Sequence, residues 1–242
     1  MSKIFQPVVI IPHYNHASTI RRVVEELRLH NLPVIIVDDG SEPAQAQVVQ
    51  QLQDLHVQVQ LNPVNQGKGA AVKDAFVLAQ QLGYSHVLQV DADGQHKLSD
   101  VLKFIQSAQS HPDTIICGLP VYGADAPKAR LYGRKITNFW NAINTWSFDL
   151  KDGMCGFRLY PLDTTLPILL EQHIGNRMDF DTEILVRCHW QQIPFLWIET
   201  PVTYHPGGVS HFKAWADNWR ISKMHARLFF GMLARKLTGK SV

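Results

Sequence analysis

The stretch Val87-Leu88-Gln89-Val90-Asp91-Ala92-Asp93-Gly94-Gln95-His96 joins an apolar run to two carboxylates that lie one residue apart. The run Val87 to Val90 predicts a buried strand, and Asp91 and Asp93 follow where that strand ends. In layered α/β proteins, ligands bind at the carboxyl ends of strands. Clustered carboxylates repel each other unless a cation joins them, and oxygen ligands suit Mg²⁺ or Mn²⁺. The stretch therefore predicts a metal site that holds a phosphorylated substrate. The alternative is a polar turn that contains two aspartates by chance.

Further apolar runs precede and follow this stretch, and amphipathic segments separate them. The predicted strands are Val8 to Ile11, Val34 to Val37, Val57 to Leu61 and Thr114 to Cys117. The predicted helices are a segment capped by Ser18, then Glu42 to Leu55, then Ala70 to Leu82, and a segment capped by Ser99. This alternation predicts an α/β fold with a mostly parallel sheet that is covered by helices on both faces.

The pattern changes after Gly118. A loop from Pro120 to Pro127 precedes a predicted helix at Arg130 to Phe148 and an irregular or extended segment at Asp152 to Tyr160. Helices at Phe180 to Trp190 and Trp215 to Leu237 flank a strand at Phe195 to Ile198. No linker marks two independent units. We therefore predict one domain over residues 1–212, with a nucleotide-binding type of α/β half at 1–118 and a second half at 119–212, followed by an amphipathic helix at 213–242.

Composition limits the class of protein. The 242 residues are 45% hydrophobic and 18% charged, with a net charge of +2. These values argue against disorder and against a nucleic-acid partner. Cys117, Cys155 and Cys188 show no metal-binding spacing and suggest a reduced, cytoplasmic protein. Because no signal peptide or apolar stretch of ~18–20 residues is present, we expect any membrane contact to be peripheral or through a partner.

Six motifs then occur in a specific order. They are Pro12-His13-Tyr14-Asn15, Val37-Asp38-Asp39-Gly40-Ser41, Asn65-Gln66-Gly67-Lys68-Gly69-Ala70-Ala71, Asp91-Ala92-Asp93-Gly94-Gln95-His96, Asp152-Gly153-Met154-Cys155-Gly156-Phe157-Arg158 and Phe180-Asp181-Thr182-Glu183-Ile184-Leu185. Over residues 7 to 212 the chain resembles family 2 glycosyltransferases, which have the GT-A fold. The resemblance is closest to the branch that makes dolichyl- or polyprenyl-phosphate sugars. It implies an inverting enzyme that uses a nucleotide-diphosphate sugar, with its nucleotide-sugar-binding half at 1–118 and its acceptor half at 119–212.

The resemblance also implies roles for residues on the donor side. The positions that match the binding site for the donor's base and ribose are Pro12, Tyr14, Asn15, Asp38 and Asp39. Gly67 and Lys68 match the loop beside the donor, where a residue without a side chain allows close approach. Asp91, Ala92 and Asp93 match the metal and ribose positions, with Gln95 as a further metal ligand. The implied cofactor is Mg²⁺ or Mn²⁺, which would neutralise the leaving diphosphate. Each motif alone could be an ordinary turn or helix-entry loop.

The acceptor side departs from the pattern of the branch. The branch has Gly-x-Arg where this chain has Gly118-Leu119-Pro120, so an expected phosphate-binding arginine is absent. Arg130 and Arg134 remain on the predicted helix, and guanidinium groups suit phosphate recognition. Their alternative role is a solvated helix face. The resemblance adds Arg158 and Ser210 to the substrate-binding residues, although Ser210 is followed by His211 where the branch has lysine.

Asp181 distinguishes two classes of acceptor. It lies where many family 2 enzymes place an acidic catalytic base, and a hydroxyl acceptor needs such a base. A phosphate acceptor is already an anion and needs none. We favour a lipid-linked phosphate, with Asp181, Asp93 and Arg134 as the catalytic residues. The alternatives are a hydroxyl acceptor with Asp181 as base, and an Asp181 that only caps a helix.

Two other functions remain as rivals. A nucleotidyltransferase would carry a glycine-rich loop after the first strand, but Pro12 to His16 contains no glycine. A non-catalytic, membrane-associated scaffold would not need Asp91, Asp93 and Gln95. The sequence does not specify the sugar, the nucleotide or the oligomeric state.

The last predicted helix combines aromatic and basic residues. Trp215, Trp219, Met224, Leu228, Met232 and Leu233 recur at near-helical spacing, with Phe229 and Phe230 beside them and several lysines and arginines between. Such a helix suits a membrane interface at the cytoplasmic face. The alternative is a helix whose apolar face packs on the domain.

Overall fold

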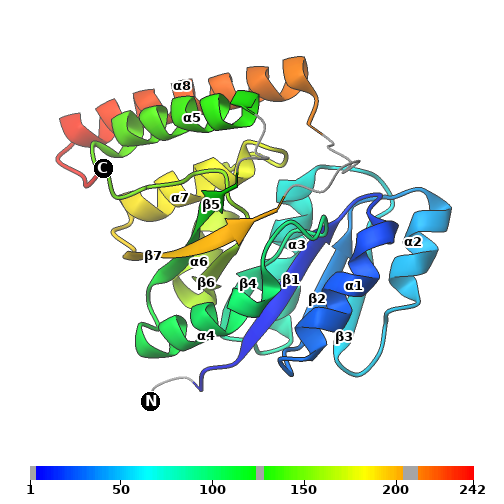
Figure 1. The fold of residues 1–242 in the computed structure, drawn as a ribbon. Coiled ribbons are helices and arrows are strands. Elements are labelled where there is room, and N and C mark those ends of the chain that lie inside the picture. The colour runs from blue at the N-terminus through cyan, green and yellow to red at the C-terminus, as the bar shows by residue number, and fades with distance from the viewer. Residues whose placement is uncertain (1–3, 124–127, 204–211) are drawn as a thin grey trace.

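A seven-stranded sheet forms the centre of the protein (Figure 1). The computed structural model describes residues 4–123, 128–203 and 212–242. The strands are β1 (Pro7–His13), β2 (Val34–Asp38), β3 (Val57–Leu61), β4 (His86–Gln89), β5 (Ile115–Tyr122), β6 (Arg158–Pro161) and β7 (Phe195–Val202), in the order β3-β2-β1-β4-β6-β5-β7. All pairs are parallel except those of β6, which runs antiparallel to both β4 and β5.

Helices cover both faces of this sheet. Helices α1 (Ala17–Arg28), α2 (Pro43–Gln50) and α4 (Val101–Ser110) pack against one face, and α4 follows the short 3₁₀ helix η1 (Leu98–Asp100). Helices α3 (Lys68–Gln81), α6 (Leu162–Glu171) and α7 (Phe180–Trp190) pack against the other. Neighbouring residues of a strand point to opposite faces, so Val8 and Ile10 join one core cluster while Val9 and Ile11 join the other. This three-layer arrangement confirms the predicted α/β fold.

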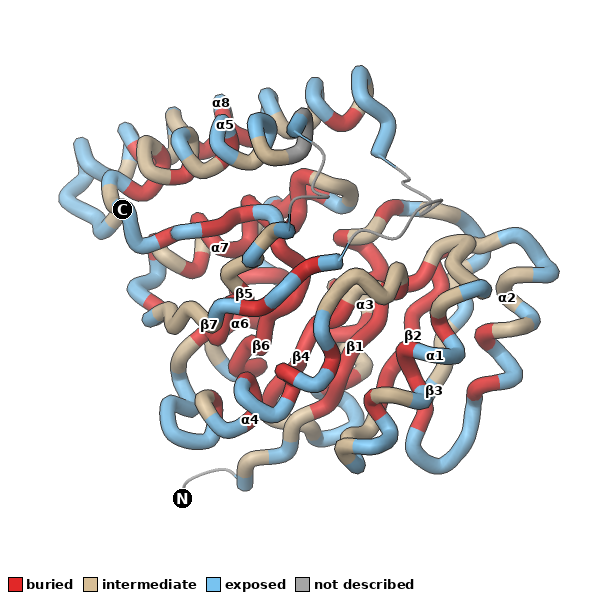
Figure 2. Tube along the Cα trace, viewed as in Figure 1, coloured by how far each residue is buried: buried red, intermediate tan, exposed pale blue. Residues whose placement is uncertain are grey.

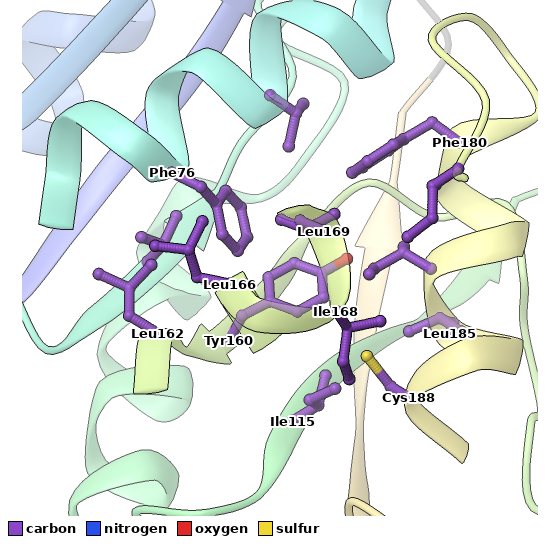
Figure 3. Packing of buried hydrophobic residues seen from close by; sticks show 14 of the residues in the cluster. Phe76, Ile115, Tyr160, Leu162, Leu166, Ile168, Leu169, Phe180, Leu185 and Cys188 are labelled. Atoms are coloured by element: carbon purple, nitrogen blue, oxygen red, sulfur yellow. The ribbon is translucent and has the colours of Figure 1, made fainter. Parts of the chain in front are cut away.

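The two core clusters are closely packed. Figure 3 shows the cluster beneath α6 and α7, in which the ring of Phe76 meets the edge of Tyr160 with centroids 5.3 Å apart. On the opposite face, Phe104 stacks on Phe157 at 4.2 Å. Fully burying an aromatic or aliphatic side chain of this size stabilises the fold by roughly 1.5–3 kcal/mol. These clusters hold the strand ends at one edge, where the polar motifs follow.

Several predicted boundaries were wrong. Helix α1 begins at Ala17 and α4 at Val101, so neither Ser18 nor Ser99 is the capping residue, and neither helix has a side-chain cap. Strand β5 continues into the first residues of the predicted loop, as far as Tyr122, because it pairs with β7 along its whole length. Since β6 pairs only with Ile116 and Cys117 of β5, the later part of β5 tolerates Pro120 on its open side.

Helices α5 (Lys128–Thr145) and α8 (Ala214–Leu237) lie side by side above α7 (Figure 1). Helix α8 has both buried and exposed positions along its length (Figure 2). Met224, Leu228 and Met232 are buried in the core cluster, whereas Trp215, Trp219 and Phe230 are exposed. The predicted apolar stripe therefore divides between two opposite faces of α8. Of the helices that the structure describes, none has the length and apolarity needed to cross a bilayer.

Candidate active site

A cavity of about 1440 Å³ opens where β1, β2 and β4 end, and it extends beneath α5 and α8. Its lining combines the ends of these strands with the start of α3 and of α7. Of the predicted site residues, Pro12, Tyr14, Asp39, Gly67, Lys68, Asp91, Ala92, Asp93, Gln95, Arg134 and Asp181 line it. The polar motifs that follow β1, β2 and β4 therefore meet at one edge of the sheet.

Asp38 and Asn15 do not line this cavity, in contrast to the predicted donor contacts. The buried carboxylate of Asp38 binds the ring of His13 at 2.6 Å and accepts hydrogen bonds from the backbone and hydroxyl of Ser41. Burial favours a raised pKa for Asp38, but these hydrogen bonds outweigh it and lower the pKa below its ordinary value. Asn15 accepts a hydrogen bond from the backbone of Glu42. Both residues hold the loops that shape the site.

Asp39 fixes the loop that leads into α3. Its two oxygens accept hydrogen bonds from the backbone N–H groups of Gln66, at 2.9 Å, and Gly67, at 2.7 Å. Burial raises the pKa of Asp39 in spite of these bonds. Gly67 has φ +109°, and a Cβ there would lie 2.4 Å from the backbone oxygen of Asn176. Only glycine suits this position, so the backbone at Lys68 is closely fixed.

The ammonium group of Lys68 joins two carboxylates from distant elements. Its Nζ lies 2.8 Å from Oδ1 of Asp91 and 2.8 Å from Oδ2 of Asp181. The second oxygen of Asp181 accepts a hydrogen bond from the buried amide of Gln89 at 3.2 Å. Burial would lower the pKa of Lys68, but the charges of Asp181 and Asp91 outweigh it and raise that pKa. Asp181 lies inside α7, after the capping position Asp179, so its alternative role as a cap was wrong.

Asp91 carries a second neighbour that the sequence did not identify. Nε2 of His96 lies 3.6 Å from Oδ2 of Asp91, and the ring of His96 rests against Phe157. Burial favours a raised pKa for Asp91, but the charge of Lys68 and the contact with His96 hold the pKa well below its usual range. Asp91 is therefore an anion that already attracts cations.

Asp93 and Gln95 lie at the same wall of the cavity. Oδ1 of Asp93 accepts the backbone N–H of Gln95 at 3.0 Å, and the carbonyl of Ala92 accepts the hydroxyl of Thr19. Among the described residues no group of three or more His, Cys, Asp or Glu side chains forms a ready metal cage. Mg²⁺ is commonly held by one or two carboxylates together with substrate phosphates, so the anionic Asp91 and the neighbouring Asp93 fit such a cation.

The basic residues predicted for the acceptor lie in different surroundings. Arg134 lines the cavity and is ion-paired through Nη1 with Asp152. Arg158 was predicted to bind substrate, but it is fully buried and donates to the carbonyl of Asp181 and to Tyr160, so it positions the start of α7 instead. Arg130 lies on α5, and Ser210 falls outside the described residues.

Helix α8 contributes unexpectedly to the cavity. Arg220, Ile221, His225 and Phe229 line it beside Arg134 and Trp140 of α5. The sequence offered only an amphipathic pattern here, which does not reveal what a helix packs against. Arg177, which donates to Asn65 at 2.9 Å, is a further lining residue that the motifs did not indicate.

Comparison with protein-family models matches residues 8–164 to the model described as Glycosyl transferase family 2. This match covers more than half of the chain. The chain belongs to glycosyl transferase family 2. A crystal structure of TarS residues 1–349 from S. aureus, in complex with UDP-GlcNAc, superposes with a TM-score of 0.62 at 15% identity, covering 93% of this chain and 66% of that chain. The likeness confirms the predicted GT-A fold of this family 2 glycosyltransferase.

Curated relatives include enzymes named for lipid-phosphate acceptors. A dolichyl-phosphate beta-glucosyltransferase of Trichomonas vaginalis is 30% identical over 73% of this chain and 59% of its own length. The UDP-N-acetylglucosamine–dolichyl-phosphate N-acetylglucosaminyltransferase of Methanococcus voltae is 27% identical over 74% of this chain and 78% of its own. Polyprenol monophosphomannose synthase of Mycolicibacterium smegmatis is 25% identical over 81% and 76%. The chain spans less than two thirds of the Trichomonas relative.

Proposed function

We propose that this glycosyltransferase moves a sugar, with inversion, from a nucleotide-diphosphate sugar to a polyprenyl phosphate. The hydrogen bonding of Asp181 is the observation that favours a phosphate acceptor. Both of its oxygens accept hydrogen bonds, one from the ammonium group of Lys68 and one from Gln89. A carboxylate whose lone pairs are engaged in this way is a poor base for a hydroxyl proton, whereas a phosphate acceptor needs no base.

Arg134 supports a phosphate acceptor. It lies on α5 and lines the cavity, and its guanidinium also lies over the ring of Tyr122, 5.3 Å from the ring centroid. Burial would lower the pKa of Arg134, but the opposite charge of Asp152 outweighs the effect of burial and raises that pKa. Arg134 therefore stays positively charged. A planar guanidinium fixed by a carboxylate is pre-organised to bind a phosphate oxygen. It stands in for the arginine that is absent beside Gly118.

A divalent cation completes the proposed donor site. Asp91 and Asp93 would hold Mg²⁺ or Mn²⁺, with Gln95 nearby, and the cation would supply the charge that neutralises the leaving diphosphate. Asp39, Pro12 and Tyr14 border the space that suits the base and ribose. Metal-dependent hydrolysis of a nucleotide sugar, lost on addition of EDTA, is the expected sign of this site.

Two variants test the choice of acceptor. With a polyprenyl phosphate acceptor, Arg134→Ala should raise the acceptor KM, while Asp181→Asn should retain much of its turnover. The adjacent, exposed Lys135→Ala is the matched control and should behave as wild type. If a hydroxyl were the acceptor, Asp181→Asn would lose the ~10²–10⁴-fold that a general base supplies, and Arg134→Ala would have little effect. That result would reverse the proposal.

The exposed face of α8 supports docking on a membrane. Trp215 and Trp219 lie one turn apart, and Phe230 follows Trp219 after three further turns, so the three share one face. Their exposed fractions are 94%, 63% and 68%. Lys223 lies over the ring of Trp219 at 5.0 Å. Exposed aromatic residues flanked by cations suit the interface of an anionic bilayer, where a lipid-linked acceptor resides.

The test of membrane docking replaces exposed residues and leaves the helix in place, because truncation would also remove Met224 and Leu228 from the core. A triple variant Trp215→Ser, Trp219→Ser and Phe230→Ser should no longer co-sediment with liposomes that contain phosphatidylglycerol. Leu55→Ser, at a fully exposed position far along the sheet, is the control. We expect wild-type binding to weaken with salt. Equal sedimentation of variant and wild type would contradict membrane docking through this face. If instead the wild type dimerised with increasing concentration and the variant did not, the face would be an interface with a second copy of the chain.

A further inference from the structure

Lys68 occupies an unusual place for a single cation. Its side chain is 18% exposed, and its Nζ contacts one carboxylate from the segment that follows β4 and one from α7. The backbone beneath it cannot adjust, because Gly67 lies against Asn176 and Gly69 against Phe180 and Gly175. The backbone of Lys68, the first residue of α3, is therefore fixed, and only its flexible side chain can move to a different partner.

The wall beside Lys68 leaves little room for a second cation. A Cβ at Gly156 would lie 2.6 Å from Oδ2 and 2.7 Å from Oδ1 of Asp91, and 2.8 Å from Nζ of Lys68. A backbone segment thus closes one side of the ion pair. His96 approaches Oδ2 of Asp91 at 3.6 Å from another side. A cation that binds Asp91 must therefore share that carboxylate with the ammonium group or displace it.

Two other cations of the cavity lining have partners of their own. Arg134 is paired with Asp152, and Arg177 donates to Asn65. Lys68 is the cation that pairs directly with Asp91, so its ammonium group moves most readily when another charge binds there. Two positive charges that compete for one carboxylate repel each other strongly inside a partly buried site. The same ammonium group becomes free to bind an anion once it leaves Asp91.

We propose that Lys68 is a movable counter-ion. Its ammonium group forms ion pairs with Asp91 and Asp181 in the free protein. When the donor and a divalent cation bind, it leaves Asp91 and pairs with a phosphate oxygen of the substrate instead. This inference rests on the proposed metal-dependent transfer. It gives Lys68 two effects of opposite sign: it weakens the binding of metal alone, and it strengthens the binding of the metal together with a phosphate ligand.

The two effects together separate this role from that of a fixed charge. A lysine that stays on Asp91 would, when replaced, strengthen the binding of metal alone and leave nucleotide binding to the metal-loaded protein unchanged. Replacing Lys68 by methionine keeps the apolar stem and removes the competing charge. We expect Lys68→Met to bind Mn²⁺ about tenfold more tightly than wild type, while its affinity for UDP or GDP in the presence of saturating Mn²⁺ falls about tenfold or more. Lys68→Arg keeps the charge and should resemble wild type in Mn²⁺ affinity.

The experiment is an electron paramagnetic resonance titration of free Mn²⁺ with wild type, Lys68→Met, Lys68→Arg and Asp91→Asn, followed by nucleotide titration of the Mn²⁺-loaded proteins. Equal Mn²⁺ affinities in wild type and Lys68→Met would overturn the Lys68 inference alone. If wild type and Lys68→Met both failed to bind Mn²⁺ at millimolar concentration, the metal proposal would fall and this inference with it.

A second measurement uses only the wild-type chain, so it does not depend on the folding of a variant. Acetic anhydride labels free amines, and mass spectrometry reports the extent of labelling at Lys68. Mn²⁺ alone should increase the labelling of Lys68 by displacing it from Asp91, and addition of UDP or GDP should decrease it again. Exposed Lys223 should be labelled equally in all three conditions. Labelling of Lys68 that is indifferent to Mn²⁺ and nucleotide would overturn the proposal.

Discussion

Glu183 is a fully buried carboxylate that connects α8 to the donor side of the cavity. It accepts hydrogen bonds from Nε and Nη2 of Arg187, from Nε and Nη2 of Arg227 on α8, and from the backbone N–H of Gly175. The next residue, Asn176, accepts a hydrogen bond from Ala70 in the first turn of α3. We therefore predict that Arg227→Met destabilises the fold and also weakens nucleotide binding.

The magnitude follows from the two bonds that Arg227 loses. Hydrogen bonds to a charged group contribute roughly 1.5–3 kcal/mol each when both partners are buried. Because 37% of the Arg227 side chain is exposed, water replaces part of that contribution. We expect a loss of about 1–3 kcal/mol. For a chain of this size that corresponds to a decrease in Tm of about 2–12 °C.

Thermal unfolding followed by circular dichroism measures the first effect, and nucleotide titration at low temperature measures the second. Lys223→Met is the matched control, one turn earlier on the same helix and exposed. Its Tm should lie within the range of an ordinary surface substitution. Glu183→Ala should cost more than Arg227→Met, because it leaves two guanidinium groups without their carboxylate. Identical Tm values for Arg227→Met and Lys223→Met would refute the reasoning.

Three further predictions concern the site and its surroundings. Gly156→Ala should displace the carboxylate of Asp91 and reduce kcat by roughly 10²-fold, with an unchanged circular dichroism spectrum. Full activity would show that the backbone at Gly156 does not confine this carboxylate. Asp93→Asn should lose metal-dependent turnover while it stays folded, and undiminished activity in EDTA would contradict its role as a ligand. Burial lowers the pKa of His225 to about 4. Because the unfolded chain binds this proton near pH 6.5, the free energy of unfolding should fall by up to about 3 kcal/mol between pH 6.5 and 4. His225→Gln should flatten that part of the stability curve measured by urea unfolding.

The sequence predicts well which motifs meet at this edge of the sheet, because its signals there are local. Each of β1, β2 and β4 is a short apolar run that leads directly into a polar motif, and parallel strands place such motifs at one edge. The sequence does not reveal which of two adjacent aspartates faces the cavity. Asp38 ends β2 and turns to His13, whereas Asp39 lines the cavity. That difference depends on tertiary packing.

The acceptor side could not be predicted for a related reason. Lys68 and Asp181 are 113 residues apart, and their contact depends on how α7 meets α3. Arg158 belongs to one of the motifs, but it begins strand β6, which is inserted antiparallel between β4 and β5, and its side chain is buried there. The periodicity of the sequence alone does not indicate this insertion. The amphipathic pattern of α8 predicted a helix but not its two apolar faces, one in the core and one exposed.

The most direct test of the proposed function is a transfer assay with a choice of acceptors. The purified chain is incubated with Mn²⁺, a panel of radiolabelled UDP- and GDP-sugars, and either a polyprenyl phosphate or the corresponding polyprenol in detergent. We predict that label from one donor enters the lipid phase only with the polyprenyl phosphate, in a product from which mild acid releases the sugar, and that Arg134→Ala raises the concentration of acceptor required. Transfer to the polyprenol, or equal transfer to both lipids, would contradict the account.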